Sequence, residues 1–202
     1  MIAILDYGVG NLFSLRSSLT HLGLEAVVTA DAQTIRKADR LILPGVVPLA
    51  MPWTSSRLPV WCRSSGSRRR KSPCWASAWE CSCSLKKSYE YGEHEGLGFV
   101  KGEVCPLEPD LKDKTLKVPQ IGWNALHIVR DDPLFRYIRE GEYVYYVHSY
   151  YGKNCTESTL AVSDYSIPVT GVVRAGRVYG TQFHPEKSGE TGLRILKAFA
   201  EL

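Results

Sequence analysis

Long apolar runs are absent from this sequence of 202 residues. No segment approaches the roughly 18 consecutive apolar residues of a membrane-spanning helix, so we expect no membrane association. The opening M-I-A-I-L-D-Y-G has neither the basic start nor the cleavage site of a secretory signal peptide, and we expect a cytoplasmic protein. Neither a linker nor an internal repeat divides the chain. We therefore expect a single domain over residues 1–202.

Pairs of C-x-x-C hooks, which would indicate a zinc site, are also absent. Four of the six cysteines lie at positions 62, 74, 81 and 83, and the nearest histidine is His94, so a zinc module is only a weak alternative. We expect no metal and no other cofactor. Cys105 and Cys155 lie outside this group, and because they need not pair, a reducing compartment is the simpler interpretation.

Residues 48–86 differ in composition from the rest of the chain. They lack isoleucine and phenylalanine but hold four of the five tryptophans and seven basic residues against one acidic residue, Glu80. This stretch therefore carries +6, and the rest of the chain carries 4 − 6 = −2. The basic run at residues 68–71 has no interleaved aromatic residues, so we expect no nucleic-acid partner.

Strand-like and helix-like segments alternate along the N-terminal part. We expect strands over residues 2–6, 25–29 and 40–43, and helices over residues 12–22 and 34–39. Further strands are expected over residues 98–104, 143–148, 160–163 and 170–180, with a closing helix over 192–202. This alternation predicts an α/β fold with a mostly parallel sheet covered on both faces and added antiparallel strands. Ligands bind such sheets at the carboxyl ends of strands, where Gly45 and His184 are expected.

One short motif carries candidate catalytic chemistry. His184 and Glu186 lie two residues apart, directly after a strand-like run, within Y-G-T-Q-F-H-P-E-K-S (residues 179–188). A carboxylate that orients an imidazole at a strand end is the base half of a nucleophile–base–orienter system. A bare H-x-E also occurs in polar turns, so the longer string decides between the two interpretations.

The string G-T-Q-F-H-P-E-K-S resembles the C-terminal motif of the class I glutamine amidotransferases. The resemblance implies that a cysteine attacks the glutamine amide, that His184 moves the proton, and that Glu186 holds His184. It also implies a three-layer α/β fold.

Three further segments narrow this resemblance. They are D-Y-G-V-G-N-L-F-S-L (residues 6–15), Q-I-G-W-N-A-L (120–126) and Y-Y-V-H-S-Y-Y-G (145–152). Together they resemble the family of glutaminase subunits of imidazole glycerol phosphate synthases. Taken as a bare pattern, Gly8-x-Gly10 is a weak nucleotide-binding signal, because the third glycine of a dinucleotide fingerprint is absent.

The same resemblance implies roles for residues outside the H-x-E motif. Ser149 and Tyr150 would hold the two ends of glutamine, partly through backbone groups. Backbone N–H groups near Gly45 and Val46, and others after the nucleophile, would stabilise the oxyanion.

A protein partner is also implied by the resemblance. It is a (β/α)8-barrel cyclase subunit that forms a heterodimer with the glutaminase and combines its ammonia with a nucleotide intermediate. The products are imidazole glycerol phosphate and aminoimidazole carboxamide ribotide, in histidine biosynthesis. Trp123 and Asn124 match the interface motif, although Trp123 also suits a core position.

The family's nucleophile elbow, roughly L-L-G-I-C-L-G-M-Q, has no counterpart in this sequence. It belongs about a hundred residues before the histidine, inside the anomalous stretch. We interpret residues 48–86 as translated out of frame, with one base lost near Val46-Val47 and one gained near Lys86-Lys87; a divergent insert is the alternative.

The genetic code tests this interpretation. In the shifted frame Trp75 followed by Ala76 requires glycine at position 76, and Trp79 followed by Glu80 requires glycine at position 80. Position 78 becomes NGC, which includes cysteine, whereas the sequence as written has Ala78. The shifted frame therefore admits G-I-C-L-G-M.

Two functions remain open from the sequence. One is a glutaminase whose written sequence contains a frame error and lacks the nucleophile. The other is a non-catalytic partner-binding subunit, or a pseudogene product, on the same scaffold. The family fold needs a helix and a central buried strand in this stretch, but the sequence as written has Arg68 and its basic neighbours there. Because burying unpaired charges is costly, we also expect poor solubility of the chain as written.

Overall fold

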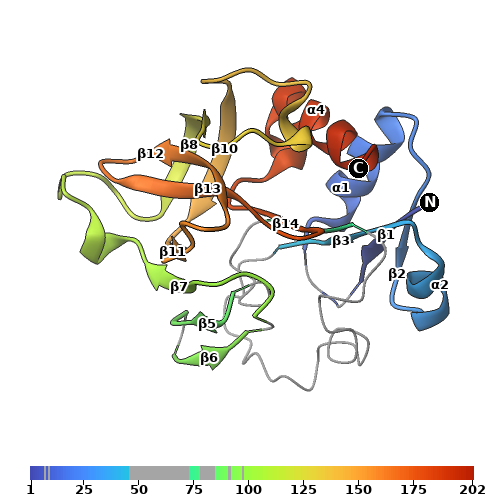
Figure 1. Cartoon of the computed structure of the whole chain (residues 1–202), viewed down its shortest axis with the longest axis horizontal. Helices are drawn as coiled ribbons and strands as arrows, with labels where there is room; N and C mark the ends of the chain where they lie inside the picture. Colours follow the sequence, from blue (N-terminus) through green and yellow to red (C-terminus); the bar gives the residue numbers. More distant parts are fainter. Residues whose placement is uncertain (7, 9, 46–72, 78–84, 91, 97) are drawn as a thin grey trace.

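The computed structural model describes residues 1–6, 8, 10–45, 73–77, 85–90, 92–96 and 98–202 (Figure 1). Its centre is an eight-stranded sheet with the order β2-β1-β3-β4-β14-β13-β12-β9. Its strands are β1 (Ile2–Leu5), β2 (Ala26–Thr29), β3 (Arg40–Leu43), β4 (Cys74–Ser77), β9 (His127–Ile128), β12 (Thr159–Asp164), β13 (Pro168–Ala175) and β14 (Val178–Thr181).

The first five strands of this order run parallel to one another, from β2 to β14. Two helices connect the early strands, α1 (Leu12–His21) and α2 (Ala32–Lys37). Each begins at a polar cap: Asn11 accepts a hydrogen bond from the backbone of Ser14, and Asp31 accepts one from Thr34 at 2.7 Å. The predicted parallel α/β sheet is therefore confirmed, and so is the strand at residues 40–43.

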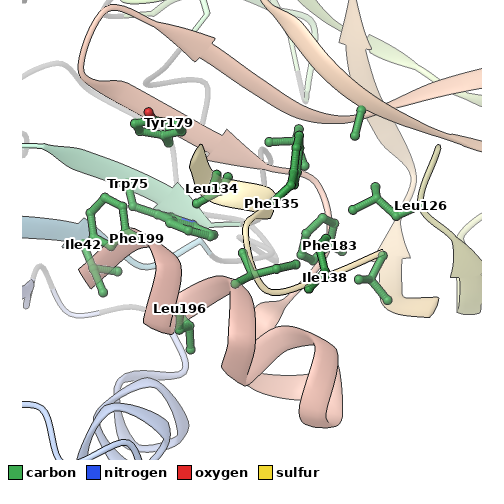
Figure 2. Close-up of a cluster of buried hydrophobic side chains, with 14 of the residues drawn as sticks. Ile42, Trp75, Leu126, Leu134, Phe135, Ile138, Tyr179, Phe183, Leu196 and Phe199 are labelled. Carbon is green, nitrogen blue, oxygen red and sulfur yellow. The ribbon is translucent and has the colours of Figure 1, made fainter. Parts of the chain in front are cut away.

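Helices cover both faces of the sheet because strand residues alternate between two cores. Ile2 and Ile4 pack on one face with α1 and with α4 (Gly189–Ala200), whereas Ala3 and Leu5 pack on the other face with α2. In Figure 2 Trp75 lies beside Phe199 of α4, with the rings edge to face and their centroids 5.0 Å apart. The two layers thus bury the central strands β1 and β14 completely, whereas the edge strand β2 is only half-buried.

The strand β4 occupies the centre of the sheet, although it comes from the anomalous stretch. Leu41 pairs with Cys74 on one side, and Val178 pairs with Cys74 on the other. Trp75 is fully buried, but its indole Nε1 has no hydrogen-bond partner. Leaving a buried donor unpaired costs about 1–3 kcal/mol, so this tryptophan suits the position poorly.

Beyond β14 the sheet becomes antiparallel, with β13, β12 and β9 added in turn. The predicted single run over 170–180 is wrong: Gly176 and Arg177 form a tight turn between two strands. The strand predicted over 98–104 lies later in the chain, as β7 (Glu103–Pro106). The closing helix, α4, begins three residues earlier than predicted.

Two smaller sheets lie beside the main sheet. One pairs β8 (Gln120–Ala125) with β10 (Tyr143–His148), and only the second of these strands is predicted from the sequence. The other has the order β11-β7-β5-β6, with β5 (Lys87–Ser88), β6 (His94–Glu95) and β11 (Tyr150–Lys153). Short 3-10 turns complete the described elements: η2 (Glu108–Asp110), η3 (Pro133–Phe135) and η4 (Pro185–Lys187).

The described helices give no membrane span, since none of them is both long and apolar enough to cross a bilayer. Within the same residues, the His, Cys, Asp and Glu side chains form no cluster of three or more suited to a metal ion. Among the described residues, Cys105 and Cys155 are free thiols.

Candidate active site

His184 and Glu186 meet at the carboxyl end of β14, as the sequence predicts. The distance from His184 Nδ1 to Glu186 Oε1 is 3.0 Å, and the two side chains are 9% and 1% exposed. One turn of 3-10 helix, η4, starts with Pro185 and returns the carboxylate to the imidazole. The imidazole Nε2 is buried and has no hydrogen-bond partner. This is the geometry of an oriented general base whose second nitrogen is available for a proton.

The backbone of β10 holds this turn in place. The N–H of His184 donates to the carbonyl of Tyr145 at 3.1 Å, and the N–H of Tyr145 donates to Ser188 Oγ at 3.0 Å. Ser188 Oγ in turn donates to the carbonyl of His184 at 2.6 Å. The helix α4 then packs closely on η4: a Cβ at Gly192 would lie 1.9 Å from the carbonyl oxygen of Pro185. Only glycine fits there, so the helix also fixes the motif.

A second buried imidazole, that of His148, lies at the end of β10. Its Nδ1–H donates to the carbonyl of Tyr150 at 2.9 Å, which leaves Nε2 as an unprotonated acceptor without a partner. The pKa of His148 is lowered to about 4, mainly by burial; the hydrogen bond to Tyr150 opposes this shift, and nearby His184 adds to it. The sequence gives no separate signal for this residue beyond the H-S-Y-Y string.

Neutral His148 makes stability sensitive to acid. Its pKa in the folded chain lies below the ordinary histidine value of 6.5, so the unfolded chain binds more protons between pH 6.5 and 4. The stabilisation is therefore complete above about pH 6.5, and about 3 kcal/mol is lost as the pH falls toward 4. We expect His148→Gln to flatten this part of the curve of unfolding free energy against pH, measured by urea unfolding. The same change at exposed His127 should leave the curve as steep as that of the original chain. A steep curve for both variants would contradict the assignment of this acid sensitivity to His148.

Ser149 and Tyr150, the predicted substrate residues, lie where the chain leaves β10 and enters β11. The carbonyl of Ser149 accepts from the N–H of Leu107 at 2.9 Å, and Tyr150 pairs with Pro106. Both side chains are half-buried. The chain thus changes from one small sheet to another directly after His148, next to the strand that holds His184.

Gly45 is buried directly after the end of β3, two strands away from β14 in the sheet. The turn after β1 packs against it: a Cβ at Gly10 would lie 2.8 Å from Pro44 Cβ and 3.6 Å from the carbonyl of Gly45. Gly10 has a φ of +103°, which also favours glycine. The other two predicted positions of the oxyanion and nucleophile region, Val46 and Ala78, lie outside the described residues.

Trp123 and Asn124 occupy opposite faces of the β8–β10 pair. Trp123 is 52% exposed and packs edge to face on Tyr145, with ring centroids 5.7 Å apart. The amide of Asn124 instead points inward, accepting from Gln120 Nε2 at 2.9 Å and donating to the carbonyl of Asp164 at 3.2 Å. Trp123 is therefore a surface residue, and Asn124 supports the strand pair from behind.

The described thiols are poor nucleophiles. Burial raises the pKa of Cys155 to about 12, and burial also raises the pKa of Cys105. Cys74 is 5% exposed and lies in the core beside Val178. A reactive cysteine needs a low pKa and access, which these positions do not provide.

Comparison with known proteins agrees with this geometry. The model of the family "Glutamine amidotransferase class-I" matches residues 91–201. Proteins named imidazole glycerol phosphate synthase subunit HisH are similar along the whole chain. One from Caldanaerobacter subterraneus subsp. tengcongensis is 40% identical and one from Listeria monocytogenes is 41% identical, covering 100% of this chain and 98% and 96% of the relatives.

Solved structures with the same fold are more distant in sequence. A GMP synthase component from Thermoplasma acidophilum, described as putative, has a TM-score of 0.69 at 16% identity, covering 99% of this chain and 92% of that one. A second structure, titled a glutamine amidotransferase, has a TM-score of 0.68 at 18% identity, covering 99% and 97%. The family match, the full-length relatives and the buried His184–Glu186 pair together establish that the chain belongs to the class I glutamine amidotransferases, alongside the HisH subunits.

Proposed function

We propose that this scaffold is the glutaminase subunit of an imidazole glycerol phosphate synthase, acting in histidine biosynthesis. It would hydrolyse glutamine to glutamate and ammonia and deliver the ammonia to a cyclase subunit. The observation that carries the proposal is the buried His184–Glu186 pair, which fixes the imidazole and leaves Nε2 without a partner. The relatives named HisH support the same assignment.

The proposed reaction uses a cysteine thiolate, which His184 generates by taking its proton at Nε2. The sulfur attacks the glutamine carboxamide carbon and forms a tetrahedral oxyanion that backbone N–H groups near Gly45 and Val46 stabilise. His184 then returns the proton to the amide nitrogen, the C–N bond breaks, and ammonia leaves a thioester. Water, deprotonated by His184, hydrolyses the thioester to glutamate and frees the thiol. Ser149 and Tyr150 hold the substrate throughout.

The nucleophile would come from position 78 in the restored reading frame. We call the protein with that frame over residues 48–86 the in-frame chain. Two observations support it: the family model begins to match only at residue 91, after the anomalous stretch, and β4 ends at Ser77, directly before position 78. A nucleophile elbow requires such a strand followed by a tight turn.

The chain as written is therefore expected to release no ammonia from glutamine. It has Ala78 where sulfur is required, and a thiol misplaced by about 1 Å already loses much of its rate. The assay is ammonia release with the cyclase and its nucleotide ligand present. Glutaminase activity of this polypeptide that His184→Ala abolishes would refute the proposal.

The proposed partner surface is the outward face of β8 and β10. It carries the exposed Ile121, Trp123 and Tyr143, and Trp123 also lies 3.8 Å from a Cβ built at Gly189, at the start of α4. The surface therefore adjoins the turn that carries His184. A contiguous exposed apolar face of this kind is typical of protein interfaces. We propose that a (β/α)8-barrel cyclase docks here to form a heterodimer.

Trp123→Ala is expected to weaken binding of the cyclase at least roughly tenfold, because aromatic anchors contribute most of an interface's affinity. Titration calorimetry or biolayer interferometry with the purified cyclase measures this loss. Val129→Ala is the control, since Val129 is a similarly exposed apolar residue, 57% exposed, beyond β9. Equal affinity for the Trp123 variant and the original chain would place the interface elsewhere.

A non-catalytic partner-binding subunit is the second candidate function. The surface just described consists of described residues outside the anomalous stretch, so it does not depend on the elbow. Cyclase binding without glutaminase activity from a gene with a confirmed shifted frame would favour this candidate.

A further inference from the structure

A cavity lies between β11 and the antiparallel strands β12 and β13 of the main sheet, which Figure 1 labels. Gly171 of β13 faces the β8–β10 pair, since a Cβ there would lie 2.9 Å from Tyr146 Oη. Because side chains alternate along a strand, its neighbour Thr170 points to the other face. Strand β11 lies there: a Cβ at Gly152 would lie 3.9 Å from Thr170 Cβ. The cavity is therefore on the opposite side of β13 from the strands proposed to bind the cyclase.

The volume of this cavity is about 520 Å³. Sites for small molecules typically have volumes of about 300–1,000 Å³. Thr170 and Val162, which are paired directly across β13 and β12, form its inner wall. Segments 151–156 and 129–130 form much of the remaining lining. These residues all lie outside the anomalous stretch, so they are the same in both reading frames.

The lining of the cavity is positively charged. It includes Arg130 and Lys153 but no acidic residue among those the structure describes. The guanidinium of Arg130 donates to the carbonyl of Glu157 at 2.9 Å, and it forms no ion pair with a described carboxylate. The ammonium of Lys153 bonds both carboxylate oxygens of Asp110, at 2.7 and 2.9 Å, and this hydrogen bonding raises the pKa of Lys153. Asp110 offsets part of that charge, so Arg130 is the main uncompensated cation.

The inner wall also offers a hydroxyl group. Thr170 is 9% exposed, and its Oγ1 makes no hydrogen bond within the described part of the chain. Thr159 differs, since its Oγ1 donates to the carbonyl of Cys155 at 3.0 Å. A buried hydroxyl is stabilised by a hydrogen-bond partner, which a ligand in the cavity supplies to Thr170. Val129 and Val162 add apolar surface, so the lining suits an organic ligand better than a bare ion.

We propose that this cavity binds a small organic phosphate, a phosphate monoester of the size of a sugar phosphate or a mononucleotide. The phosphate binds Arg130 and Lys153, because a planar fork of N–H donors matches phosphate oxygens and a dianion suits two cations. The organic part packs on Val129 and Val162 and bonds the hydroxyl of Thr170. This site goes beyond the proposed glutaminase function and does not rest on it, since none of these residues is assigned to glutamine or to the cyclase.

Isothermal titration calorimetry of the full chain tests the site, with AMP and ribose phosphate as probes. The ionic strength is held at about 0.1 M, because salt screens the attraction of a phosphate to exposed cations. Adenosine and ribose are the matched probes without phosphate. We expect saturable binding at a single site, at least roughly tenfold tighter for the phosphate esters than for adenosine and ribose. Where the chain as written is insoluble, the in-frame chain replaces it, because its cavity residues are identical.

Three variants locate the binding site. Arg130→Gln removes the guanidinium and should weaken binding of the phosphate esters at least roughly tenfold. Thr170→Val keeps the volume of the side chain but removes the hydroxyl, so a loss of about threefold or more is expected. Arg16→Gln is the control, since Arg16 is exposed on α1, which contacts β2 in the parallel half of the sheet. It removes the same charge far from the cavity, and the affinity should stay within about twofold.

Three outcomes overturn the proposal. The first is no saturable binding of either phosphate ester. The second is an equal loss of affinity for Arg16→Gln and Arg130→Gln, which would indicate only long-range attraction to a basic protein. The third is inorganic phosphate that binds as tightly as both esters, which would show that the apolar lining contributes nothing. Tighter binding of the esters that Arg130→Gln abolishes and Arg16→Gln preserves supports the site, whether or not the chain releases ammonia from glutamine.

Discussion

Restoring the reading frame over residues 48–86 is expected to turn an inactive protein into a glutaminase. The restored frame requires glycines at positions 76 and 80 and admits the cysteine at position 78, together with apolar neighbours for β4. The glycines flank the nucleophile at −2 and +2, the spacing of a strand-turn-helix elbow. With the cyclase and its nucleotide ligand present, we expect glutamine hydrolysis at least roughly 1,000-fold above that of the chain as written.

Ala78→Cys in the chain as written is the matched control, and it should stay inactive. It adds sulfur without the elbow, so the oxyanion donors and the helix N-terminus that lower the thiol pKa are not in position. Equal activity of this point variant and the in-frame chain would show that the elbow is dispensable. An inactive in-frame chain, assayed with its partner, would contradict the frame interpretation.

The second large effect is expected at the His184–Glu186 pair. In the in-frame chain, His184→Ala should lower kcat about 1,000-fold or more, because it removes the group that takes and returns the proton. Glu186→Gln should lower kcat less, since the imidazole keeps its position but loses the charge that stabilises its protonated form. Stopped assays of ammonia release under saturating glutamine give both values.

His127→Ala is the control for these two variants. His127 also pairs with a glutamate, Glu140, at 2.7 Å, but its side chain is 49% exposed and lies on β9, at the far edge of the sheet. Its loss should leave kcat unchanged. A kcat that falls equally for His127→Ala and His184→Ala would mean that the effects are structural.

Much of this fold follows from local patterns in the sequence. The early strands and helices follow from the spacing of apolar residues and from the caps Asn11 and Asp31. The position of β8 does not follow from the sequence pattern, because Gly122 and the exposed Ile121 and Trp123 make this segment unlike a buried strand. It forms because β10 pairs with it over six residues, which is a long-range contact.

The candidate site is only partly predictable from the sequence, for a similar reason. His184 and Glu186 lie two residues apart in the chain, so the motif itself specifies their contact. Ser188 and His148 reach the site from two different elements, and their roles follow from hydrogen bonds to Tyr145 and Tyr150 that exist only after folding.

At position 75, within the anomalous stretch, the residue in the structure can be compared with the one that the shifted frame encodes. The codon of Cys74 ends in T or C and that of Trp75 begins with TG, so the shifted frame requires TTG or CTG, and both encode leucine. Leucine suits a central buried strand and carries no polar atom. The frame interpretation therefore predicts leucine in place of the buried Trp75, whose indole N–H has no hydrogen-bond partner.

Sequencing the gene across codons 44–90 tests the central claim most directly. Our account predicts a continuous open frame that encodes G-I-C-L-G at positions 76–80 and leucine at position 75. A confirmed gene sequence that encodes Trp75, Ala78 and Trp79 would contradict it, and would leave a partner-binding subunit or a pseudogene product on this scaffold.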